Sequence, residues 1–570
     1  MSSSADPQRL MTAIEARLLA PGAPFEMAQI EVAGAPVRVF KNRPPHLRAL
    51  LAGALAQAPS EAECMRFVGH DGERTYTYAD LRDQVAAMAR ALSEEYAVTR
   101  GDRVAILAAN GPEWVITFWA TVSLGAVAVG LNGWWAGEEI VQGVAHADPK
   151  VLVADRKRLA RVPDAAARLG VPVVVVEDDF EALLERHPAS ALPETPIDEQ
   201  DPAVMLYTSG TTGRPRAAVH SHLNVTSAVG VSFFHGARTL AAKGMRPGDP
   251  DAPPNTILVT SPLFHVSGLH AAAVTSIAGG ARTVWLTGRF DPALALDVIE
   301  RERVTSWGYT ATVLHRLVHD PSAKDHDLSA MRLLGGGGSP IAPPLQDAAL
   351  ALVPQCRDTM GVGYGLTEGC GFSTLIPGPE LRAFPDSVGR PLPLVDVEIR
   401  DEAGAPVPDG TDGEIFVRGP MVMLEYFRDP EATAAAIGPE RWLRTGDLGH
   451  LTDGRLYLAT RLRDLILRGG ENIYPQEIEL RLEAHPDVAE AAVLGVPHEA
   501  LGEEVKAVVV PRRGARPTPE ALSAWVAGAL AKHKVPAHWE LRDAPLPRNA
   551  TGKVLKRALE PDGTNPFIEE

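Results

Sequence analysis

The sequence is poor in cysteine and in positive charge. Its three cysteines, Cys64, Cys356 and Cys370, supply neither a disulfide framework nor a metal-binding spacing, and they indicate a reducing cytoplasm. The net charge of −17 argues against nucleic acid as a partner, because no general basic face is available. A local basic cleft for a nucleotide is still compatible with this charge.

Long hydrophobic runs and targeting signals are also scarce. Residues 1–6 lack the basic-then-apolar order of a signal peptide. The uncharged run at 115–131 approaches the length of a membrane span, but Thr, Ser and Gly residues interrupt it. We expect a buried helix, a turn at Gly125 and a buried strand rather than a transmembrane span. Peripheral contact with a membrane stays open as an alternative.

Length and composition predict more than one globular domain. The 570 residues are 45% hydrophobic and 22% charged, and they exceed one ordinary core. Strand-like apolar runs alternate with helical patterns, which predicts an α/β fold with helix-covered sheets. Short strands with Gly and Asp turns indicate a β-rich part at about 386–460. We expect a large N-terminal domain at 1–462, with mixed sheets and this β-rich part, and a small, mobile α+β C-terminal domain at 463–570.

A polar, glycine-punctuated loop follows the apolar strand at 204–207. Glycines allow backbone N–H groups to converge on an anion, and Ser/Thr hydroxyls add donors. The spacing does not fit the Walker pattern, and an ordinary turn is the alternative interpretation. The loop consists of Thr208, Ser209, Gly210, Thr211, Thr212 and Gly213, with Arg216 shortly after it.

Two further segments have side chains suited to a nucleotide. In the stretch 363–368, Tyr364 can present its face to a purine, and Thr367 can donate to a phosphate oxygen. Glu368 offers the carboxylate that Mg²⁺ prefers alongside phosphate oxygens. Asp447, in Arg-Thr-Gly-Asp-Leu, can accept both hydroxyls of a ribose. A turn with a solvated carboxylate is the alternative for each segment.

The segment 207–216 resembles the phosphate-loop signature of the adenylate-forming superfamily, which includes acyl-CoA synthetases, adenylation domains and luciferases. Lysine commonly stands there where this chain has Arg216. Four more motifs follow in the family's order, at 363–368, 444–448, 467–479 and 547–553. The resemblance covers roughly 70–560.

The resemblance implies roles for individual residues. Thr208, His265, Glu368 and Lys553 are the expected catalytic residues, with Glu368 as the metal ligand. Lys553 brings the positive charge that balances the carboxylate and the α-phosphate. Arg463 is the expected hinge. The expected contacts to ATP and CoA come from Thr208, Ser209, Gly210, Thr211, Thr212, Gly213, Arg216, Gly337, Gly338, Gly363, Tyr364, Gly365, Thr367, Asp447, Arg461, Gly469, Gly470 and Lys553.

An acyl pocket is expected beside the nucleotide. The run of four glycines at 335–338 either widens that pocket or is flexible. The family's Val-x-Pro element is replaced by Thr310-Ala311-Thr312. The expected lining residues are His265, Trp307, Gly308, Tyr309 and Gly336.

The resemblance implies an ATP-, Mg²⁺- and CoA-dependent carboxylate–CoA ligase that forms acyl-AMP and pyrophosphate, then acyl-CoA and AMP. A fatty or other bulky hydrophobic acid is the expected substrate. The alternatives are an aryl, phenylpropanoid or sterol-side-chain acid, and an acyl-AMP ligase or a regulator that does not use CoA. A homodimer is also compatible with the sequence.

Overall fold

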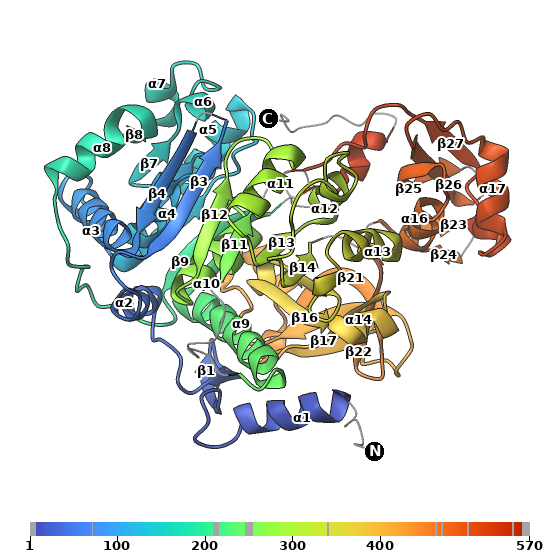
Figure 1. Cartoon of the computed structure of the whole chain (residues 1–570), viewed down its shortest axis with the longest axis horizontal. Helices are drawn as coiled ribbons and strands as arrows, with labels where there is room; N and C mark the ends of the chain where they lie inside the picture. The colour runs from blue at the N-terminus through green and yellow to red at the C-terminus, as the bar shows by residue number, and fades with distance from the viewer. Residues whose placement is uncertain are drawn as a thin grey trace.

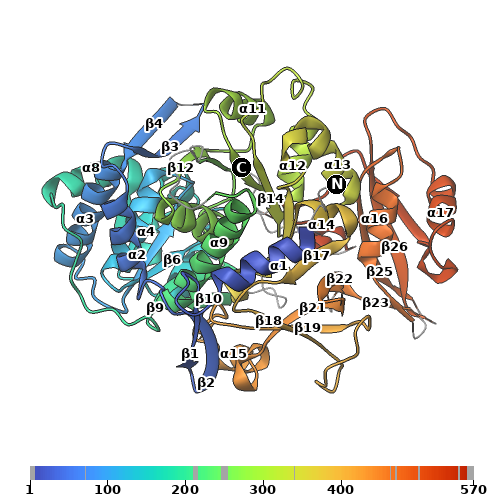
Figure 2. The ribbon, with the colours of Figure 1, turned by 60° about the horizontal axis from the view of Figure 1, so that its bottom comes forward.

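The fold is α/β, as the sequence predicts. The structure is a computed structural model that describes residues 7–70, 72–208, 216–245, 255–338, 341–461, 464–468, 471–498, 501–549 and 552–560. Figures 1 and 2 both show a large body and a smaller part formed by the C-terminal elements from β23 onward. Among the described residues, no helix is both long and apolar enough to cross a membrane.

The first sheet of the large body carries the strand that leads into the predicted phosphate loop. Its central strands are parallel and buried on both faces, as expected for runs of Val, Ile, Leu and Ala. In spatial order, its described strands are β20 (Glu425–Tyr426), β10 (Arg216–Ser221), β9 (Pro202–Thr208), β6 (Val127–Gly130), β5 (Arg103–Leu107), β7 (Val151–Ala154) and β8 (Val173–Val175).

The second sheet continues from parallel strands into the β-rich part. The parallel order β12-β11-β13-β14-β15 places the carboxyl ends of these strands at one edge, where open α/β sheets bind ligands. In spatial order, its described strands are β18 (Asp396–Arg400), β19 (Gly413–Arg418), β21 (Leu443–Thr452), β22 (Arg455–Arg461), β17 (Ser387–Pro391), β16 (Gly371–Pro377), β15 (Gly361–Leu366), β14 (Leu333–Gly337), β13 (Ser306–Tyr309), β11 (Thr256–Val259), β12 (Arg282–Leu286), β3 (Glu63–Gly69) and β4 (Gly72–Thr77).

The run at 115–131 forms a buried helix, a turn and a strand, which confirms the prediction from sequence. The helix is α4 (Pro112–Ser123), Gly125 has a φ of +72°, and β6 follows at once. Because the helix packs in the core of the large body, its apolar character is explained without a membrane.

Helices cover the sheets of the large body (Figure 1). They are α1 (Pro7–Leu18), α2 (Leu47–Gln57), α3 (Tyr78–Glu94), α5 (Gly137–Ala147), α6 (Arg156–Leu159), α7 (Ala165–Leu169), α8 (Val176–Arg186), α9 (His222–Ala242), α10 (Thr275–Ala278), α11 (Pro292–Arg301), α12 (Ala311–Val318), α13 (Pro343–Leu352), α14 (Gly378–Ala383) and α15 (Pro430–Ala436). Between α1 and α2 the chain forms a hairpin of β1 (Met27–Val32) and β2 (Ala35–Phe40).

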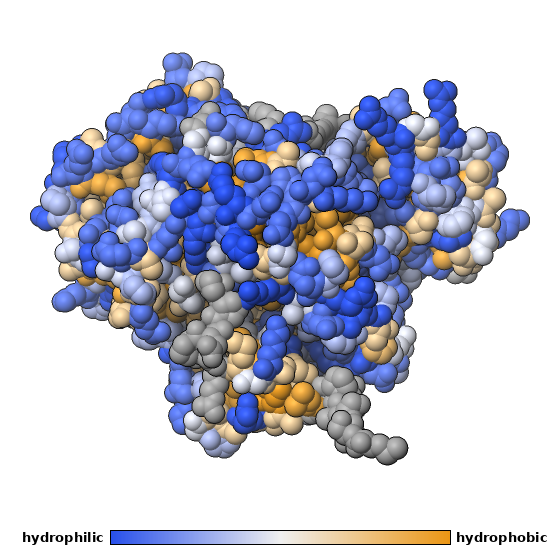
Figure 3. Space-filling model, in the orientation of Figure 1, coloured by the Kyte–Doolittle hydropathy of each residue, from blue (hydrophilic) through white to orange (hydrophobic). Residues whose placement is uncertain are grey.

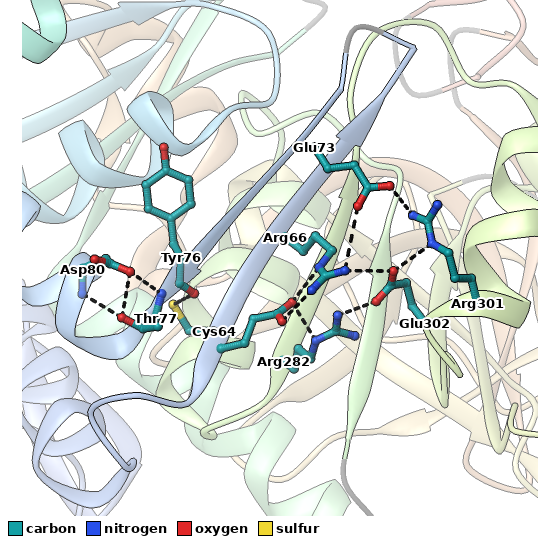
Figure 4. A network of polar contacts seen from close by, with 10 residues as sticks. Cys64, Arg66, Glu73, Tyr76, Thr77, Asp80, Arg282, Arg301 and Glu302 are labelled. Carbon is teal, nitrogen blue, oxygen red and sulfur yellow. Dashed lines mark hydrogen bonds and ion pairs between the residues drawn. The ribbon is translucent and has the colours of Figure 1, made fainter.

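An ion-pair network fixes the edge of the second sheet (Figure 4). Arg282 pairs with Glu63 at 2.7 Å and also with Glu302, while Arg66 bonds Glu302 at 3.2 Å. These residues come from β3, β12 and the end of α11. The network therefore ties the early β3–β4 hairpin to the later parallel strands, and it lies away from the predicted site.

The smaller part has its own sheet and core. Its described strands are β24 (Glu471–Ile473), β23 (Ile466–Arg468), β26 (Gly502–Pro511), β25 (Val488–His498) and β27 (His538–Leu541). The helices α16 (Pro475–Glu483) and α17 (Pro519–Ala527) pack on them. On the face in Figure 3, hydrophilic residues dominate the surface of both parts.

Candidate active site

The two ends of the predicted phosphate loop are joined by a hairpin. Thr208, at the end of β9, is the antiparallel partner of Arg216, at the start of β10. The Thr208 hydroxyl also donates to the Arg216 carbonyl oxygen at 3.3 Å. The residues between them, including Ser209 to Gly213, lie outside the described residues. The hairpin holds both ends of this segment at the edge of the first sheet.

Arg216 is connected to the predicted metal ligand through Tyr426. The guanidinium carbon lies 5.4 Å from the centre of the Tyr426 ring, and Nε lies 3.5 Å from Asp429. The Tyr426 hydroxyl donates to Oε1 of Glu368 at 2.7 Å. Burial and the Glu368 charge raise the pKa of Tyr426, so the phenol stays protonated and remains a donor. Arg216, Tyr426 and Glu368 therefore form one charged cluster.

The glycine strip belongs to a strand rather than to a flexible loop, and the widening of the acyl pocket stays a prediction. Gly335 to Gly337 lie in β14, between β13 and β15. A Cβ added at Gly336 would lie 2.2 Å from Ile341 and 2.7 Å from Tyr309. A Cβ added at Gly337 would lie 2.6 Å from the Phe372 ring. Neighbouring side chains already fill the space beside Gly336 and Gly337, whereas a Cβ at Gly338 would have nothing within 4 Å.

The predicted ribose and adenine residues meet directly. The Tyr364 hydroxyl donates to Oδ2 of Asp447 at 2.8 Å, which joins the end of β15 to β21. Asp447 also faces Arg461 across the β21–β22 ladder, although the Arg461 side chain lies outside the described atoms. One carboxylate is thus held beside an aromatic ring, an arrangement suited to a nucleoside.

The segment that carries Lys553 docks on the large body at α12. Thr312 Oγ1 donates to the carbonyl oxygen of Gly552 at 2.7 Å and accepts from Nη1 of Arg548 at 3.0 Å. Gly552 has a φ of +79°, and a Cβ there would lie 2.8 Å from Thr312 Oγ1, so glycine is required. The Lys553 N–H donates to Oδ1 of Asn549 at 2.9 Å, which closes the turn.

A cavity of about 1520 Å³ lies between the large body and the smaller part. Tyr364, Asp447 and Lys553 all line it, together with Gly338, Gly363 and Gly365. The cavity is large enough for a nucleotide and a further group. Its wall combines a ribose-type carboxylate, an aromatic ring and an ammonium, which suits an adenylate.

The five predicted acyl-pocket residues are not among the described lining of that cavity. Trp307 and Tyr309 are buried, with ring centroids 5.5 Å apart, and the Trp307 N–H donates to Thr260 Oγ1 at 3.2 Å. His265 packs on Phe264, and burial lowers the His265 pKa to about 4. Its Nε2 and the Tyr309 hydroxyl have no partner among the described residues. Gly308 is exposed, and Gly336 is buried.

Several predicted residues fall in segments outside the described part of the chain. The hinge residue Arg463 and the glycines Gly469 and Gly470 lie outside the described residues, as does most of the phosphate loop.

Three residues were missed by the sequence prediction. Tyr426 bonds Glu368, Phe372 covers Gly337 and Gly363, and Thr312 holds the lysine segment. The signals in the sequence are weak. Only the replacement of Val-x-Pro at 310–312 marked one of these positions as unusual.

Comparison with known proteins identifies the class. A family model described as "AMP-binding enzyme" matches residues 52–427, and "AMP-binding enzyme C-terminal domain" matches residues 477–553. The chain therefore belongs to the AMP-binding enzyme family.

Named relatives and solved structures agree with this assignment. The chain is 34% identical to a feruloyl-CoA synthase of an Amycolatopsis species, over 85% of this chain and 93% of that protein. It is 32% identical to the long-chain-fatty-acid–CoA ligase FadD13 of Mycobacterium tuberculosis, over 85% and 92%. The ATP-bound structure of MatB from Rhodopseudomonas palustris matches 90% of this chain and 98% of that one, with a TM-score of 0.79 and 29% identity.

Proposed function

We propose that the large cavity between the two parts is the site of a carboxylate–CoA ligase. The protein is an ATP-dependent, AMP-forming acid–thiol ligase. The observation that carries this assignment is the Tyr364–Asp447 pair, which shares one cavity with Lys553 in a chain of the AMP-binding family. The support is chemical: the wall supplies a ring for adenine, a carboxylate for ribose and a cation for the reacting anions.

The reaction has two displacements. In the first, a carboxylate oxygen of the acid attacks the α-phosphorus of ATP, and pyrophosphate leaves. Lys553 offsets the negative charges that this attack brings together. In the second, the CoA thiol attacks the acyl carbonyl, loses its proton, and AMP leaves. Thr208 and Arg216, at the ends of the phosphate loop, orient the phosphates.

Magnesium fits the carboxylate of Glu368. Its Oε1 accepts from Tyr426, and a hard carboxylate oxygen is the kind of ligand that Mg²⁺ takes together with phosphate oxygens. The ion would supply charge neutralisation for the phosphates. Tyr426, on whose ring Arg216 packs, orients this carboxylate through its hydroxyl.

We infer that the second displacement follows a rotation of the smaller part about Arg463. The support is the docking of Gly552 on Thr312, which brings Lys553 to the cavity and commits the smaller part to one face. Gly469 and Gly470 would then line the path for the pantetheine arm of CoA after rotation. Gly470→Leu should block thioester formation and leave acyl-AMP formation intact.

The substrate that we propose is a bulky hydrophobic acid, either fatty or aryl. The aryl alternative has support from the exposed ring of Phe372 and from the feruloyl-CoA synthase relative. The fatty acid has support from the FadD13 relative.

An acid panel tests both the reaction and the substrate. Purified protein with Mg-ATP should release pyrophosphate with the correct acid, and CoA should convert the product to thioester and AMP. Ferulate and related aryl acids would be compared with saturated fatty acids of increasing length by kcat/KM. Products ADP and orthophosphate would exclude the proposed chemistry.

We also propose a cytoplasmic location. A homodimer is a further proposal, which a mass measurement tests. All three cysteines are buried and free, which suits a reducing compartment. Light scattering of the purified chain, with and without ATP, would give its mass. Sedimentation with lipid vesicles would detect peripheral membrane contact.

A further inference from the structure

Three buried side chains that the proposed mechanism does not use gather behind the Thr367–Glu368 turn. They are His220 in β10, His270 in the π-helix η1 (Ser267–Val274), and Cys370. One ring nitrogen of each histidine and the cysteine sulfur all lie within 4.8 Å of one another. The residues are at most 2% exposed. They are distant in sequence, which explains why cysteine spacing gave no sign of them.

The hydrogen bonds leave nitrogen atoms available in this cluster. His220 Nε2 lies 2.7 Å from the Thr367 carbonyl oxygen, so Nε2 carries the proton and Nδ1 has a lone pair. This Nδ1 and Nε2 of His270 are buried and have no partner among the described residues. Nδ1 of His270 lies 3.2 Å from the Cys370 sulfur. Buried polar atoms without partners are costly and call for an explanation.

The distances suit a shared metal ion. Zn–N bonds are about 2.0 Å and Zn–S bonds about 2.3 Å, so two ligand atoms on one tetrahedral ion lie roughly 3.3–3.7 Å apart. The separation of 3.2 Å between His270 and Cys370 is close to this range, and His220 needs only a small adjustment. Imidazole and thiolate are the ligands that select zinc or copper over magnesium and calcium.

The protonation states are compatible with a metal. Burial lowers the pKa of His220 to about 4 and the pKa of His270 well below its usual value, so both rings are neutral ligands. Burial raises the pKa of the Cys370 thiol, which therefore keeps its proton without a cation. A coordinating metal displaces the proton from a thiol.

The backbone at the cluster is unusual in two places. His270 lies in a π-helix, a form that is rare and frequent at functional sites. Cys370 is a non-glycine residue with a φ of +57°, directly after the 3₁₀ turn η3 (Thr367–Gly369). Such backbone is strained and persists where the surroundings fix it. Here it aims two side chains at one another.

We propose that His220, His270 and Cys370 bind one thiophilic transition-metal ion, Zn²⁺ or Cu⁺. The ion takes Nδ1 of His220, a ring nitrogen of His270 and the thiolate of Cys370, whose proton is released on binding. It joins β10, η1 and the turn that carries Thr367 and Glu368. Its role is to fix that turn from behind, separate from any Mg²⁺ at Glu368.

Metal content tests the proposal without an activity assay. The full chain, without a metal-binding tag, would be produced in medium supplemented with zinc or with copper and analysed by mass spectrometry for bound metal. We expect about one equivalent of zinc or copper, which the two media distinguish. Less than a tenth of an equivalent in both media overturns the proposal.

Variants assign the ligands. Cys370→Ser and His270→Ala should lower the metal content at least tenfold. His220→Gln removes the Nδ1 ligand but keeps a donor for the Thr367 carbonyl oxygen. Cys356→Ser, at another buried cysteine, is the matched control and should keep the metal. Full metal content in Cys370→Ser would also overturn the proposal.

Cobalt provides a readout on the wild-type protein, which does not depend on how the His220, His270 and Cys370 variants fold. Wild-type protein produced with Co²⁺ should show a thiolate-to-cobalt absorption band in the near ultraviolet. The same band in Cys356→Ser would support the assignment to Cys370. Wild-type protein with bound cobalt and no thiolate band would exclude Cys370 as a ligand.

Discussion

Replacing Thr312 by valine should slow acyl-AMP formation and spare thioester formation. Valine keeps the shape of threonine but removes the hydroxyl that donates to Gly552 and accepts from Arg548. A neutral hydrogen bond contributes about 0.5–1.5 kcal/mol and one to a charged group about 1.5–3 kcal/mol. Arg548 keeps its own bonds to Gly552 and Glu490, so the net loss is about 2 kcal/mol.

This loss acts on the docking of the lysine segment. A change of about 2 kcal/mol shifts an equilibrium roughly 30-fold. Because Lys553 lines the cavity in the docked arrangement, acyl-AMP formation should fall by up to about 30-fold. Conversion of supplied acyl-AMP and CoA to thioester should not fall, because it does not need this contact. Each half-reaction would be followed separately, the first by pyrophosphate release and the second by thioester formation.

Thr310 provides the matched control. Its hydroxyl is buried and has no partner among the described residues, so Thr310→Val removes a hydroxyl without removing a hydrogen bond. We expect Thr310→Val to retain both half-reactions. An equal loss in Thr310→Val and Thr312→Val, or an equal loss of both half-reactions in Thr312→Val, would refute the role of this contact.

Changes at three further positions test the site, and a change at Glu483 tests stability. Lys553→Ala should slow acyl-AMP formation about 10²–10³-fold, the effect of removing one group that stabilises a developing charge, and should leave the second half-reaction active. Glu368→Gln should raise the Mg²⁺ concentration needed for activity, because it removes the charge that binds the ion. Arg216→Lys should stay active, because lysine keeps the positive charge although it lacks the planar guanidinium. Arg216→Ala should raise the KM for ATP, because it removes that charge. Glu483→Gln should raise the Tm at pH 8 and leave it unchanged at pH 4.

The sign of the Glu483 effect follows from its pKa. Burial, followed by the neighbouring charge of Glu479, raises the Glu483 pKa to about 7. The folded state then holds a proton that the unfolded state loses, so stability falls as pH rises from about 4.5 to 7. The side chain is partly exposed, so we expect Gln to stabilise the protein by roughly 1–3 kcal/mol above pH 7. A Tm of Glu483→Gln that is raised at pH 4 but not at pH 8 would contradict this prediction.

Matched variants control for the other changes. Lys532 is exposed in the smaller part and is not among the described lining of the cavity, so Lys532→Ala makes the same charge change away from the reacting groups. Glu425 is exposed next to Tyr426, so Glu425→Gln is the control for Glu368→Gln. A variant of Arg216 with unchanged ATP kinetics would show that its guanidinium contacts only Tyr426 and Asp429.

The sequence predicted those parts of the fold that one local signal dominates. The buried helix, turn and strand at 115–131 followed from an apolar run broken by glycine. The run at 335–338 was harder, because glycine has little strand propensity of its own. Gly335 to Gly337 are in β14 because β13 and β15 pair with them on both sides. Pairing between distant segments decides such a case, and a single stretch of sequence does not report it.

The candidate site divides in the same way. Tyr364 and Asp447 could be proposed from their motifs, and in the structure the Tyr364 hydroxyl lies 2.8 Å from Oδ2 of Asp447. Tyr426 and Thr312 could not, because each acts through a contact with a residue far along the chain. Motifs thus locate the groups that we propose to contact the substrates, whereas the residues that hold those groups emerge only from the packing.

These holding residues explain how one chain can separate two reactions. Glu368 is fixed from within the large body by Tyr426, so its position does not depend on the smaller part. In the described arrangement, the contact of Gly552 with Thr312 holds the turn that carries Lys553 at the cavity. Because that contact consists of a few hydrogen bonds, it is strong enough to favour the docked arrangement and weak enough to break. In the rotation that we propose, the nucleotide site stays assembled while the lysine leaves and the path for the thiol opens.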